Sequence, residues 1–521
     1  MSGETPARSV ALQIDPAAAW KLRASPERLG SIIALSGLLI LAFALRLIPV
    51  VFVPSLNWWD EIFQTTEPAH RLVFGVGLVP WEFQLGARSW ILPGVFAGLM
   101  ELSRVIGDGP DYYLPIIAGA CDLLAMIPVV CCFLWCRRLF GLTGAIVGGL
   151  CVAVAPELVY FGARTLNEVV AAHLLVLALY LLEPGYRVTS RRRLFSAGAI
   201  LALVFVLRVQ IAPAIALIGL WSTIGAPWAR FAAIAGGGLS VLAFVALLDA
   251  LTLGYPFASI WRYVLYNGFY GVSSTFGVEP WYYYGLMELM IWLAGLFVLL
   301  PLVLLGARRT VLPFAAALVI IAVHSIIAHK EYRFIYPAVV LLAVEAGIGL
   351  AALVTSVPER LNDRGRWRSL ARPAAAGALA GGWCLLSFLT WTGPAMAALR
   401  YRVHDYLAAT SLVAHMAGIC GIGLYGLDGK DWARYGGYSW LHQPVPMYWP
   451  KDGDELEATA ASFDILLYTT DIHPAPPMPA GFVKERCFDE VCLARRAGKC
   501  DGAPMMPMPF PEPLAGLRPH R

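Results

Sequence analysis

The sequence contains few charged residues for its length. Asp, Glu, Lys and Arg make up 14% of the 521 residues, against about 25% in an average soluble domain, whereas 59% of the residues are hydrophobic and the mean hydropathy is +0.66. A chain of this length with so little charge cannot fold with water as its main solvent, so lipid must surround most of it. The composition excludes a soluble enzyme, and nothing in the sequence points to nucleic-acid binding.

Three other patterns are missing as well. Residues 1–30 are polar and contain proline, without the apolar core and cleavage site of a signal peptide, so we expect a cytoplasmic N-terminal segment ahead of a signal anchor. No spacing of cysteine and histidine resembles a zinc site, and no internal repeat of the kind found in secondary transporters is recognisable. We therefore expect no metal ion and no cofactor.

Long apolar runs are what the sequence does contain, each about long enough to cross roughly 30 Å of hydrocarbon. Two short runs flank Arg208, and counting them separately gives eleven spans, whereas one tilted helix would give ten. Clusters of arginine follow alternate runs, and only eleven spans place every cluster in the cytoplasm, where such residues concentrate. The predicted spans are residues 31–53, 113–136, 142–160, 167–183, 194–207, 210–224, 229–252, 284–306, 310–328, 334–355 and 373–393.

The same arrangement predicts which segments face away from the cytoplasm. We expect a catalytic membrane domain over residues 31–393, preceded by a cytoplasmic N-terminus and embedded in the lipid bilayer. Its unusual acidic, aromatic and basic residues lie in the external segments rather than at the bilayer centre, where a transporter would place charge. These segments are residues 54–112, 161–166, 253–283 and 328–333, followed by the chain after residue 393.

The last part of the chain differs in composition from the rest. Short strands are predicted at residues 418–425 and 465–470 with a helix at 455–463 between them, which indicates a small extracytoplasmic α/β domain over residues 394–500. Residues 501–521 are rich in proline and are predicted to be disordered. Four cysteines of this region could form disulfides in an exported domain, but the spacing leaves their pairing open. They are Cys420, Cys487, Cys492 and Cys500.

The first external loop carries two adjacent carboxylates, Asp60 and Glu61, just beyond a span. Such a pair is costly near lipid unless water or a binding site surrounds it. One reading is a general base that deprotonates an acceptor hydroxyl, and the other is an acidic pair at the membrane interface. A loop of this length is often functional. Its further polar and aromatic candidates are Glu67, His70, Trp81, Glu82 and Arg88.

A second cluster, His329, Lys330 and Arg333, brings three potential cations into five residues at a span boundary. Positive charge would stabilise a departing polyprenyl phosphate, although snorkelling to lipid headgroups is the alternative. Because the positive-inside rule predicts few basic residues on this face, the cluster favours function. Weaker candidates are Trp281 and Tyr282, which could line a sugar or prenyl groove or belong to an interfacial belt, and Arg164 and Arg208, which could reach a headgroup or pair with a neighbouring charge.

These segments resemble, in order and in sequence, the glycosyltransferase family 22 mannosyltransferases, the alpha-mannosyltransferases of N-glycan and GPI-anchor assembly. Two features depart from the family pattern: Trp59 replaces the usual proline, and the C-terminal region does not match the eukaryotic members. The resemblance covers roughly residues 30–355. The matching elements are Trp59-Asp60-Glu61, Glu67-Pro68-Ala69-His70, Trp81-Glu82, Arg88-Ser89, Pro280-Trp281-Tyr282-Tyr283-Tyr284 and His329-Lys330-Glu331-Tyr332-Arg333-Phe334.

The resemblance implies a helical membrane protein of the GT-C fold that transfers a sugar, most often mannose, from a polyprenyl or dolichyl phosphate with inversion. It implies that Asp60 is the base, that Glu61 positions Asp60 or the acceptor, and that no metal is required. The acceptor would be a glycan or a lipid-linked molecule on the non-cytoplasmic face. The alanine- and arginine-rich composition indicates a bacterial member, for which this face is the periplasm. In a eukaryotic member it would be the ER lumen. The expected donor-phosphate ligands are His329, Lys330, Arg333 and Arg208. The expected substrate-binding residues are Glu67, His70, Trp81, Glu82, Arg88, Arg164, Trp281, Tyr282 and Glu331.

Two other functions compete with this hypothesis. A transporter or flippase of a lipid-linked sugar would also be polytopic, but it needs polar groups through the bilayer centre. A non-catalytic scaffold would use the external C-terminal region to bind partners.

Overall fold

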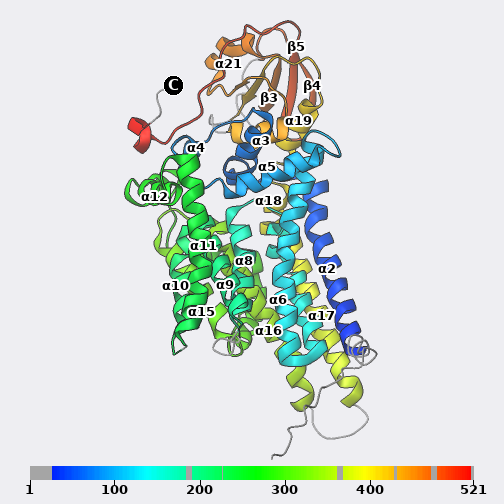
Figure 1. Ribbon diagram of the computed structural model, residues 1–521. Coiled ribbons are helices and arrows are strands. Elements are labelled where there is room, and N and C mark those ends of the chain that lie inside the picture. The colour runs from blue at the N-terminus through cyan, green and yellow to red at the C-terminus, as the bar shows by residue number, and fades with distance from the viewer. Residues whose placement is uncertain are drawn as a thin grey trace, which may run out of the picture.

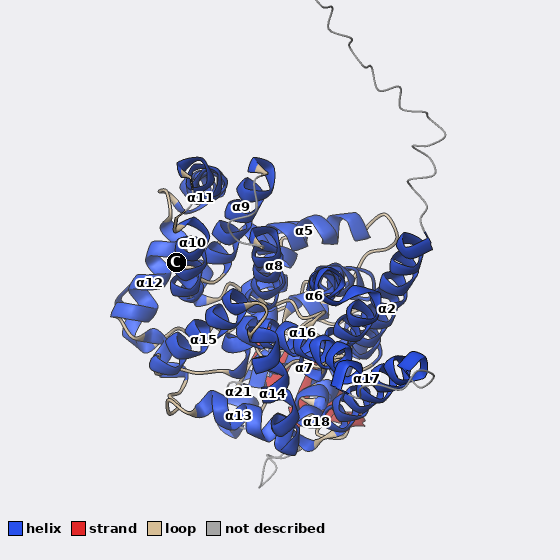
Figure 2. Cartoon of the chain, turned by 90° about the horizontal axis from the view of Figure 1, so that it is seen from below, coloured by secondary structure: helices blue, strands red, loops and turns tan. Residues whose placement is uncertain are grey.

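The computed structural model describes residues 26–183, 190–225, 227–360, 368–426, 431–470 and 478–517. Most of the predicted cytoplasmic N-terminal segment, with its basic residues Arg8, Lys21 and Arg23, lies outside the described residues. The described part consists of a long helical bundle with a small sheet at one end, opposite the start of the first helix (Figure 1). Viewed along the bundle, the helices surround a central group around α16 (Figure 2).

Each predicted span coincides with a helix. Six segments of the described chain are long and apolar enough to cross a membrane, and four shorter apolar helices accompany them. The number of crossings, eleven, stays a prediction. The helices at the predicted spans are α2 (Pro26–Phe52), α6 (Pro110–Ala153), α7 (Pro156–Phe161), α8 (Asn167–Leu182), α9 (Arg191–Leu207), α10 (Ala212–Thr223), α11 (Trp228–Leu253), α13 (Tyr283–Trp292), α14 (Leu296–Ala307), α15 (Val311–Ile326), α16 (Tyr336–Arg360) and α17 (Arg368–Thr392).

Two predicted spans, residues 113–136 and 142–160, fall largely within α6, which reverses between them. Gly141 has a φ of 77°, a left-handed conformation that glycine adopts readily. The thiol of Cys132 lies 3.4 Å from the carbonyl oxygen of Gly148, 16 residues later. A straight helix would separate these residues by about 24 Å at 1.5 Å per residue. The chain therefore turns back at Gly141, and the two halves pack side by side as the two predicted spans require.

Helix α16 forms the centre of the bundle, and 83% of the residues in its most apolar stretch are buried. Its neighbour α14 approaches so closely that a Cβ on Gly349 would lie 1.9 Å from the carbonyl oxygen of Leu302. A Cβ on Gly306 would likewise lie 2.0 Å from the carbonyl oxygen of Glu345. Small residues at such positions let helix backbones meet in lipid, where packing rather than exclusion of water drives association.

The first external loop folds into short helices instead of remaining irregular. Helix α3 ends where Gly75 adopts a φ of 74°, and the amide of this glycine bonds to the carbonyl of Arg71, a common way to stop a helix. The first external loop and the segment that follows α11 both lie at the sheet end of the bundle (Figure 1). Their helices are η1 (Ile62–Thr66), α3 (Glu67–Phe74), α4 (Trp81–Gln84), α5 (Ile91–Ser103), α12 (Ala258–Val264), η4 (Leu265–Phe269) and η5 (Val272–Phe276).

The C-terminal region carries a five-stranded sheet in the order β2-β1-β3-β5-β4. Strand β1 is parallel to β2 and β3, whereas β5 is antiparallel to β3 and β4. Strands β1 and β3 lie where the sequence predicts strands, and the other three were not predicted. The elements are α18 (Pro394–Tyr401), α19 (His404–Ala414), β1 (Ile422–Tyr425), α20 (Tyr438–Leu441), β2 (Met447–Tyr448), α21 (Gly453–Thr459), β3 (Ile465–Thr469), β4 (Phe482–Phe488) and β5 (Val491–Arg496).

This C-terminal region shares a hydrophobic cluster with the first loop. Leu56, Ile62 and Phe63 of the loop are buried together with Tyr406 of α19 and Leu467 of β3. The two parts of the chain therefore fold against each other rather than as separate bodies.

Two disulfides close the C-terminal region, Cys420–Cys500 and Cys487–Cys492. Beyond them, the structure differs from the predicted disorder as far as Leu517. Leu514, in the short helix η11 (Glu512–Leu517), is fully buried in a cluster with Tyr266 and Val272 of the segment after α11 and with Ala87 of the first loop. Residues 518–521 lie outside the described residues.

Candidate active site

One arginine, Arg333, joins the two predicted chemical segments. It lies in the short helix η7 (Tyr332–Ile335), directly before α16, and its side chain is 4% exposed. Nε donates to Glu331 at 2.7 Å, Nη1 to Glu168 at 2.7 Å and Nη2 to Asp60 at 2.5 Å. All three nitrogens of the guanidinium are therefore engaged by carboxylates. The predicted role of Arg333 as a phosphate ligand stays a prediction, whereas its observed contacts orient Asp60.

Asp60 and Glu61 have different surroundings although they are adjacent. Asp60 binds Arg333 through Oδ2, and its side chain remains 26% exposed. Glu61 is buried, and its Oε1 accepts from the backbone amides of Asn57 and Trp58, both at 3.4 Å. Burial raises the pKa of Glu61, while Arg164 and these amides oppose the rise. Of these two adjacent residues, Asp60 is the one whose carboxylate an acceptor could reach.

Glu61 instead holds the turn that carries Asp60, together with Arg164. Arg164 Nη1 lies 3.3 Å from Glu61 Oε2, and its guanidinium also donates to the backbone carbonyl and hydroxyl of Ser55. Thr165 donates to the backbone carbonyl of Glu61 at 2.8 Å. The segment between α7 and α8 thus holds the start of the first loop in place. Arg164 was predicted to bind substrate, but its contacts here are within the protein.

Glu168, the second residue of α8, links Arg333 to Arg208. Its Oε1 lies 2.9 Å from Arg208 Nη1, and its side chain is fully buried. Arg208 lies at the end of α9, and its guanidinium carbon Cζ is 5.0 Å from the centre of the Phe334 ring. One continuous charge network therefore connects three helix termini. It runs from Asp60 to Arg333, then to Glu168 and Arg208. Arg208 pairs with a neighbouring charge, as one of the two predicted alternatives required.

His329 and Lys330 are held by intramolecular partners. Lys330 Nζ donates to the backbone carbonyls of Ile327, Glu279 and Ala328 at 2.5, 2.8 and 3.5 Å. An ammonium group has three hydrogens, so these carbonyls occupy it fully. His329 Nδ1 lies 2.8 Å from the carbonyl oxygen of Gly277, and its Nε2 lies 3.2 Å from Glu331.

Glu331 couples this histidine to Arg333. Burial would raise the pKa of Glu331, but Arg333 and His329 outweigh it and lower the value to about 2. In the same way, burial opposes protonation of His329, but the bonds to Glu331 and to the Gly277 carbonyl raise its pKa. Glu331 was predicted to bind substrate, and in the structure it completes the support of Arg333.

Glu67 and His70 connect the first loop to the C-terminal region. Glu67 is fully buried and accepts backbone amides from Leu78, Tyr438 and Ser439 at 2.7, 3.0 and 2.8 Å. His70 Nε2 lies 3.0 Å from His442 Nδ1. Both were predicted to bind substrate. Both roles stay predictions, and in the structure backbone amides contact both oxygens of Glu67.

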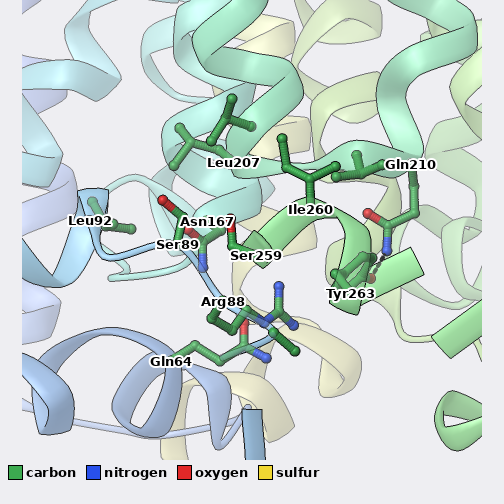
Figure 3. Close-up of a pocket in the computed structure, with 13 residues that line it drawn as sticks. Gln64, Arg88, Ser89, Leu92, Asn167, Leu207, Gln210, Ser259, Ile260 and Tyr263 are labelled. Atoms are coloured by element: carbon green, nitrogen blue, oxygen red, sulfur yellow. Dashed lines mark hydrogen bonds between the residues drawn. The ribbon is translucent and has the colours of Figure 1, made fainter. Parts of the chain in front are cut away.

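A cleft lies between the first loop, the ends of α8 and α9, and α12, and Figure 3 draws the residues that line it. Its volume is about 30 Å³, and Figure 3 shows Arg88 and Gln64 on one side with Tyr263 and Gln210 on the other. Sequence analysis singled out Arg88 but missed Gln64, Ser259 and Tyr263. The signal for Gln64 was its position four residues after Asp60 on a helical segment, which places the two on one face. The lining residues are Gln64, Ala87, Arg88, Ser89, Leu92, Asn167, Val206, Leu207, Val209, Gln210, Ser259, Ile260 and Tyr263.

The remaining predicted residues take different positions. Glu82 is buried, accepts from Gln64 at 3.0 Å and lies 3.6 Å from Arg88. Trp81 packs beside Tyr266 in the cluster that holds the C-terminal segment. Trp281 and Tyr282 are 75% and 53% exposed, and neither lines the cleft.

Comparison with known proteins identifies the family to which these contacts belong. The profile of the Alg9-like mannosyltransferase family matches residues 38–442, well over half of the chain. The chain belongs to this family. The match begins inside α2 and ends at His442, so it includes the charge network and the contacts of Glu67 and His70 with α20.

Individual relatives agree with this assignment, and one solved structure shares the fold. GPI mannosyltransferase 3 of Yarrowia lipolytica is 28% identical over 317 residues, which are 58% of this chain and 59% of the relative. GPI alpha-1,2-mannosyltransferase 3 of Danio rerio is 28% identical over 362 residues, 64% and 60% of the two chains. The chain thus spans about 60% of the length of these curated relatives. ArnT of Cupriavidus metallidurans, at 13% identity and a TM-score of 0.59 over 89% of this chain and 97% of its own, shares the fold. With its apolar helices, the protein is an integral membrane protein.

Proposed function

We propose that this protein transfers mannose from a polyprenyl-phosphate carrier to a hydroxyl group of a glycan or lipid-linked acceptor. The family and the names of the relatives support mannose as the sugar, and the likeness to ArnT, whose structure was solved with undecaprenyl phosphate, is consistent with such a carrier. The single observation that carries the proposal is the accessible Asp60 carboxylate, held through one oxygen by a buried arginine.

In this mechanism Asp60 acts as general base in a single displacement. The acceptor hydroxyl oxygen attacks the anomeric carbon of the sugar, its proton passes to Asp60, and the bond from that carbon to the phosphate oxygen breaks. The polyprenyl phosphate leaves with the bonding electron pair on its oxygen. Because the hydroxyl attacks the face opposite the leaving group, the configuration at the anomeric carbon inverts. Arg333 holds Oδ2, which leaves the other carboxylate oxygen to receive the proton, and positioning of this kind contributes much of the acceleration in enzymes.

The site would face away from the cytoplasm. Its charge network lies at the sheet end of the bundle, where Cys420–Cys500 and Cys487–Cys492 form disulfides. Disulfides persist in the periplasm or the ER lumen and are rare in the cytosol. The arginine clusters at the opposite span ends support the same orientation.

The test is transfer of label from polyprenyl-phosphate mannose to extracted lipid and glycan acceptors in purified membranes. Asp60→Asn should lower turnover by about 100-fold or more, since loss of a general base typically costs 10²–10⁴. Asp111→Asn is the matched control, because Asp111 is 58% exposed and stands on the same face. Near-normal turnover by Asp60→Asn would exclude Asp60 as base. Carriage of the labelled lipid across proteoliposomes without transfer would instead support the transporter alternative.

A further inference from the structure

The cations of the charge network bind groups of the protein or lie away from the cleft. Each guanidinium nitrogen of Arg333 binds a carboxylate, and the ammonium of Lys330 is surrounded by backbone carbonyls. Arg208 pairs with Glu168 through Nη1, and its Nε and Nη2 have no partner among the described residues, but its side chain is 3% exposed and is not one of those that line the cleft. A phosphate bound in the cleft needs positive charge within hydrogen-bond reach. That charge must come from a cation of the cleft itself.

Arg88 has that capacity. Its closest carboxylate, Glu82, lies at 3.6 Å, beyond ordinary hydrogen-bond distance. Its guanidinium lies 4.9 Å from the centre of the Tyr263 ring, and its buried Nε has no hydrogen-bond partner among the described residues. This cation–π contact holds the guanidinium group while Nε remains without a partner among the described residues. A guanidinium of this kind matches the oxygens of a phosphate in two-point geometry.

The rest of the cleft supplies the other features that a carrier phosphate requires. Gln64 is 4% exposed, and its Nε2 donates to Glu82 at 3.0 Å, which holds this carboxylate beside Arg88. Asn167 begins α8, a helix of 16 residues whose N-cap residue makes no side-chain bond, so the positive end of its dipole lies at the cleft wall. The apolar lining of Leu92, Leu207 and Ile260 offers a surface for the first isoprene units.

The cleft also adjoins the base. Gln64 follows Asp60 by four residues on a helical segment, Asn167 precedes Glu168, and Leu207 precedes Arg208. Burial lowers the pKa of Arg88, but Glu82 and Tyr263 raise it, and Asp60 and Glu168 add to this effect. The Asp60 carboxylate is therefore within electrostatic range of Arg88.

From this geometry we propose that the cleft around Arg88, Gln64 and Asn167 binds the phosphate monoester of the lipid carrier, with Arg88 as the principal ligand. The assignment rests on the proposed function and replaces the predicted set of His329, Lys330, Arg333 and Arg208. Arg333 then serves as a positioning residue for Asp60, while Arg88 stabilises the charge that develops on the departing phosphate.

The experiment measures equilibrium binding of radiolabelled undecaprenyl phosphate to the full-length protein in phosphatidylcholine nanodiscs, with undecaprenol and inorganic phosphate as competitors. Arg88→Gln should weaken binding by about 10- to 100-fold, the range for loss of charged hydrogen bonds, and Arg88→Lys by less. The donor KM should rise in parallel while the acceptor KM stays constant. Undecaprenol should displace the labelled carrier poorly from wild type but more nearly as well as undecaprenyl phosphate does from Arg88→Gln, because the variant has lost the phosphate ligand. Inorganic phosphate should compete only at much higher concentration, because it lacks the prenyl chain.

Two variants separate this role from a structural one. Arg104→Gln removes an exposed arginine from the end of the neighbouring helix α5 and should change nothing. Glu82→Gln removes the partner of Arg88 and should preserve binding, whereas a purely structural Glu82–Arg88 pair would make both substitutions equally harmful. Unchanged carrier affinity in Arg88→Gln, or a rise confined to the acceptor KM, would overturn the proposal. If wild type bound the carrier through Arg88 but transferred no sugar, the binding site would stand and the proposed function would fail.

Discussion

Replacement of Arg333 by lysine tests whether the geometry of its guanidinium, rather than its charge, organises the site. Arg333→Lys keeps the positive charge but offers one nitrogen where arginine offers three. Glu331, Glu168 and Asp60 lie 2.7, 2.7 and 2.5 Å from three separate nitrogens. A single ammonium cannot bind all three carboxylates in these positions, because they surround the plane of the fork.

The expected magnitude follows from the lost bonds. About two charge-assisted hydrogen bonds disappear, each worth about 1.5–3 kcal/mol. Glu168 keeps Arg208, so the loss in stability should be near 3 kcal/mol, toward the lower end of the cost of breaking a buried ion pair, about 3–5 kcal/mol. Asp60 loses its fixed orientation, and a misplacement of about 1 Å can cost roughly 100-fold in rate.

Turnover in membranes and thermal unfolding in detergent measure the two effects. We expect kcat to fall by about 10- to 100-fold with a smaller change in donor KM, and the unfolding midpoint to drop. Arg104→Lys is the control, since Arg104 is 48% exposed and its recorded contacts, with Glu101 at 3.0 Å and with the Phe74 ring, lie outside the charge network. Wild-type kcat in Arg333→Lys would refute the positioning role, because charge alone would then suffice.

Three further predictions concern the supports of the site. Glu67→Gln should destabilise the protein by about 1–3 kcal/mol, because an amide hydrogen would face the Ser439 amide. Burial raises the pKa of Glu67 from 4.5 to about 7, so wild type, unlike Glu67→Gln, becomes less stable as the pH rises from 4.5 through 7. The unfolding midpoints of the two proteins should therefore differ more at pH 5 than at pH 8. Removing the Cys420–Cys500 disulfide, whose cysteines are 80 residues apart, should cost about 4.5 kcal/mol by loop entropy; equal midpoints of Cys420→Ser/Cys500→Ser and wild type would contradict this. Leu514→Ala should cost about 2–5 kcal/mol locally, visible as faster hydrogen exchange around Ala87, and unchanged exchange there would argue against anchoring by the C-terminal segment.

The positions of the helices could be predicted from the sequence because lipid imposes a simple rule. Backbone groups in hydrocarbon must be satisfied within the segment, so a sufficiently long apolar run becomes a helix. The reversal at Gly141 lies between two runs that hydropathy already separated. In contrast, β4 was missed because its middle residues Lys484, Glu485 and Arg486 are all exposed, which leaves an edge strand without the alternation that identifies strands.

The reactive segments could be predicted, but their pairing could not. Asp60 and Arg333 were each singled out from local context, yet they are 273 residues apart, and only the fold brings them together. The phosphate role predicted for Lys330 came from its charge, and the carbonyls that surround it belong to loop geometry that a sequence does not display.

The prediction that ionisable groups gather at one face was incomplete. Arg46, Asp122, His173 and Glu345 are buried within α2, α6, α8 and α16. Each is a single polar residue in an apolar run, so averaging over the run conceals it. Arg46 donates to backbone carbonyls of Ala42 and of the end of α6, which shows that such a residue can serve packing between helices.

The contact between Glu67 and α20 has a consequence for how the protein is made. Tyr438 lies 371 residues after Glu67, so at roughly 5–20 residues per second the ribosome needs tens of seconds to supply the amides that this carboxylate binds. During that interval the first loop must stay hydrated at the membrane surface. A chain that stopped before Tyr438 would already contain Asp60, Arg333 and Arg88 but would leave Glu67 without its partners. The contact that joins the first loop to α20 is therefore among the last to form as the chain is made.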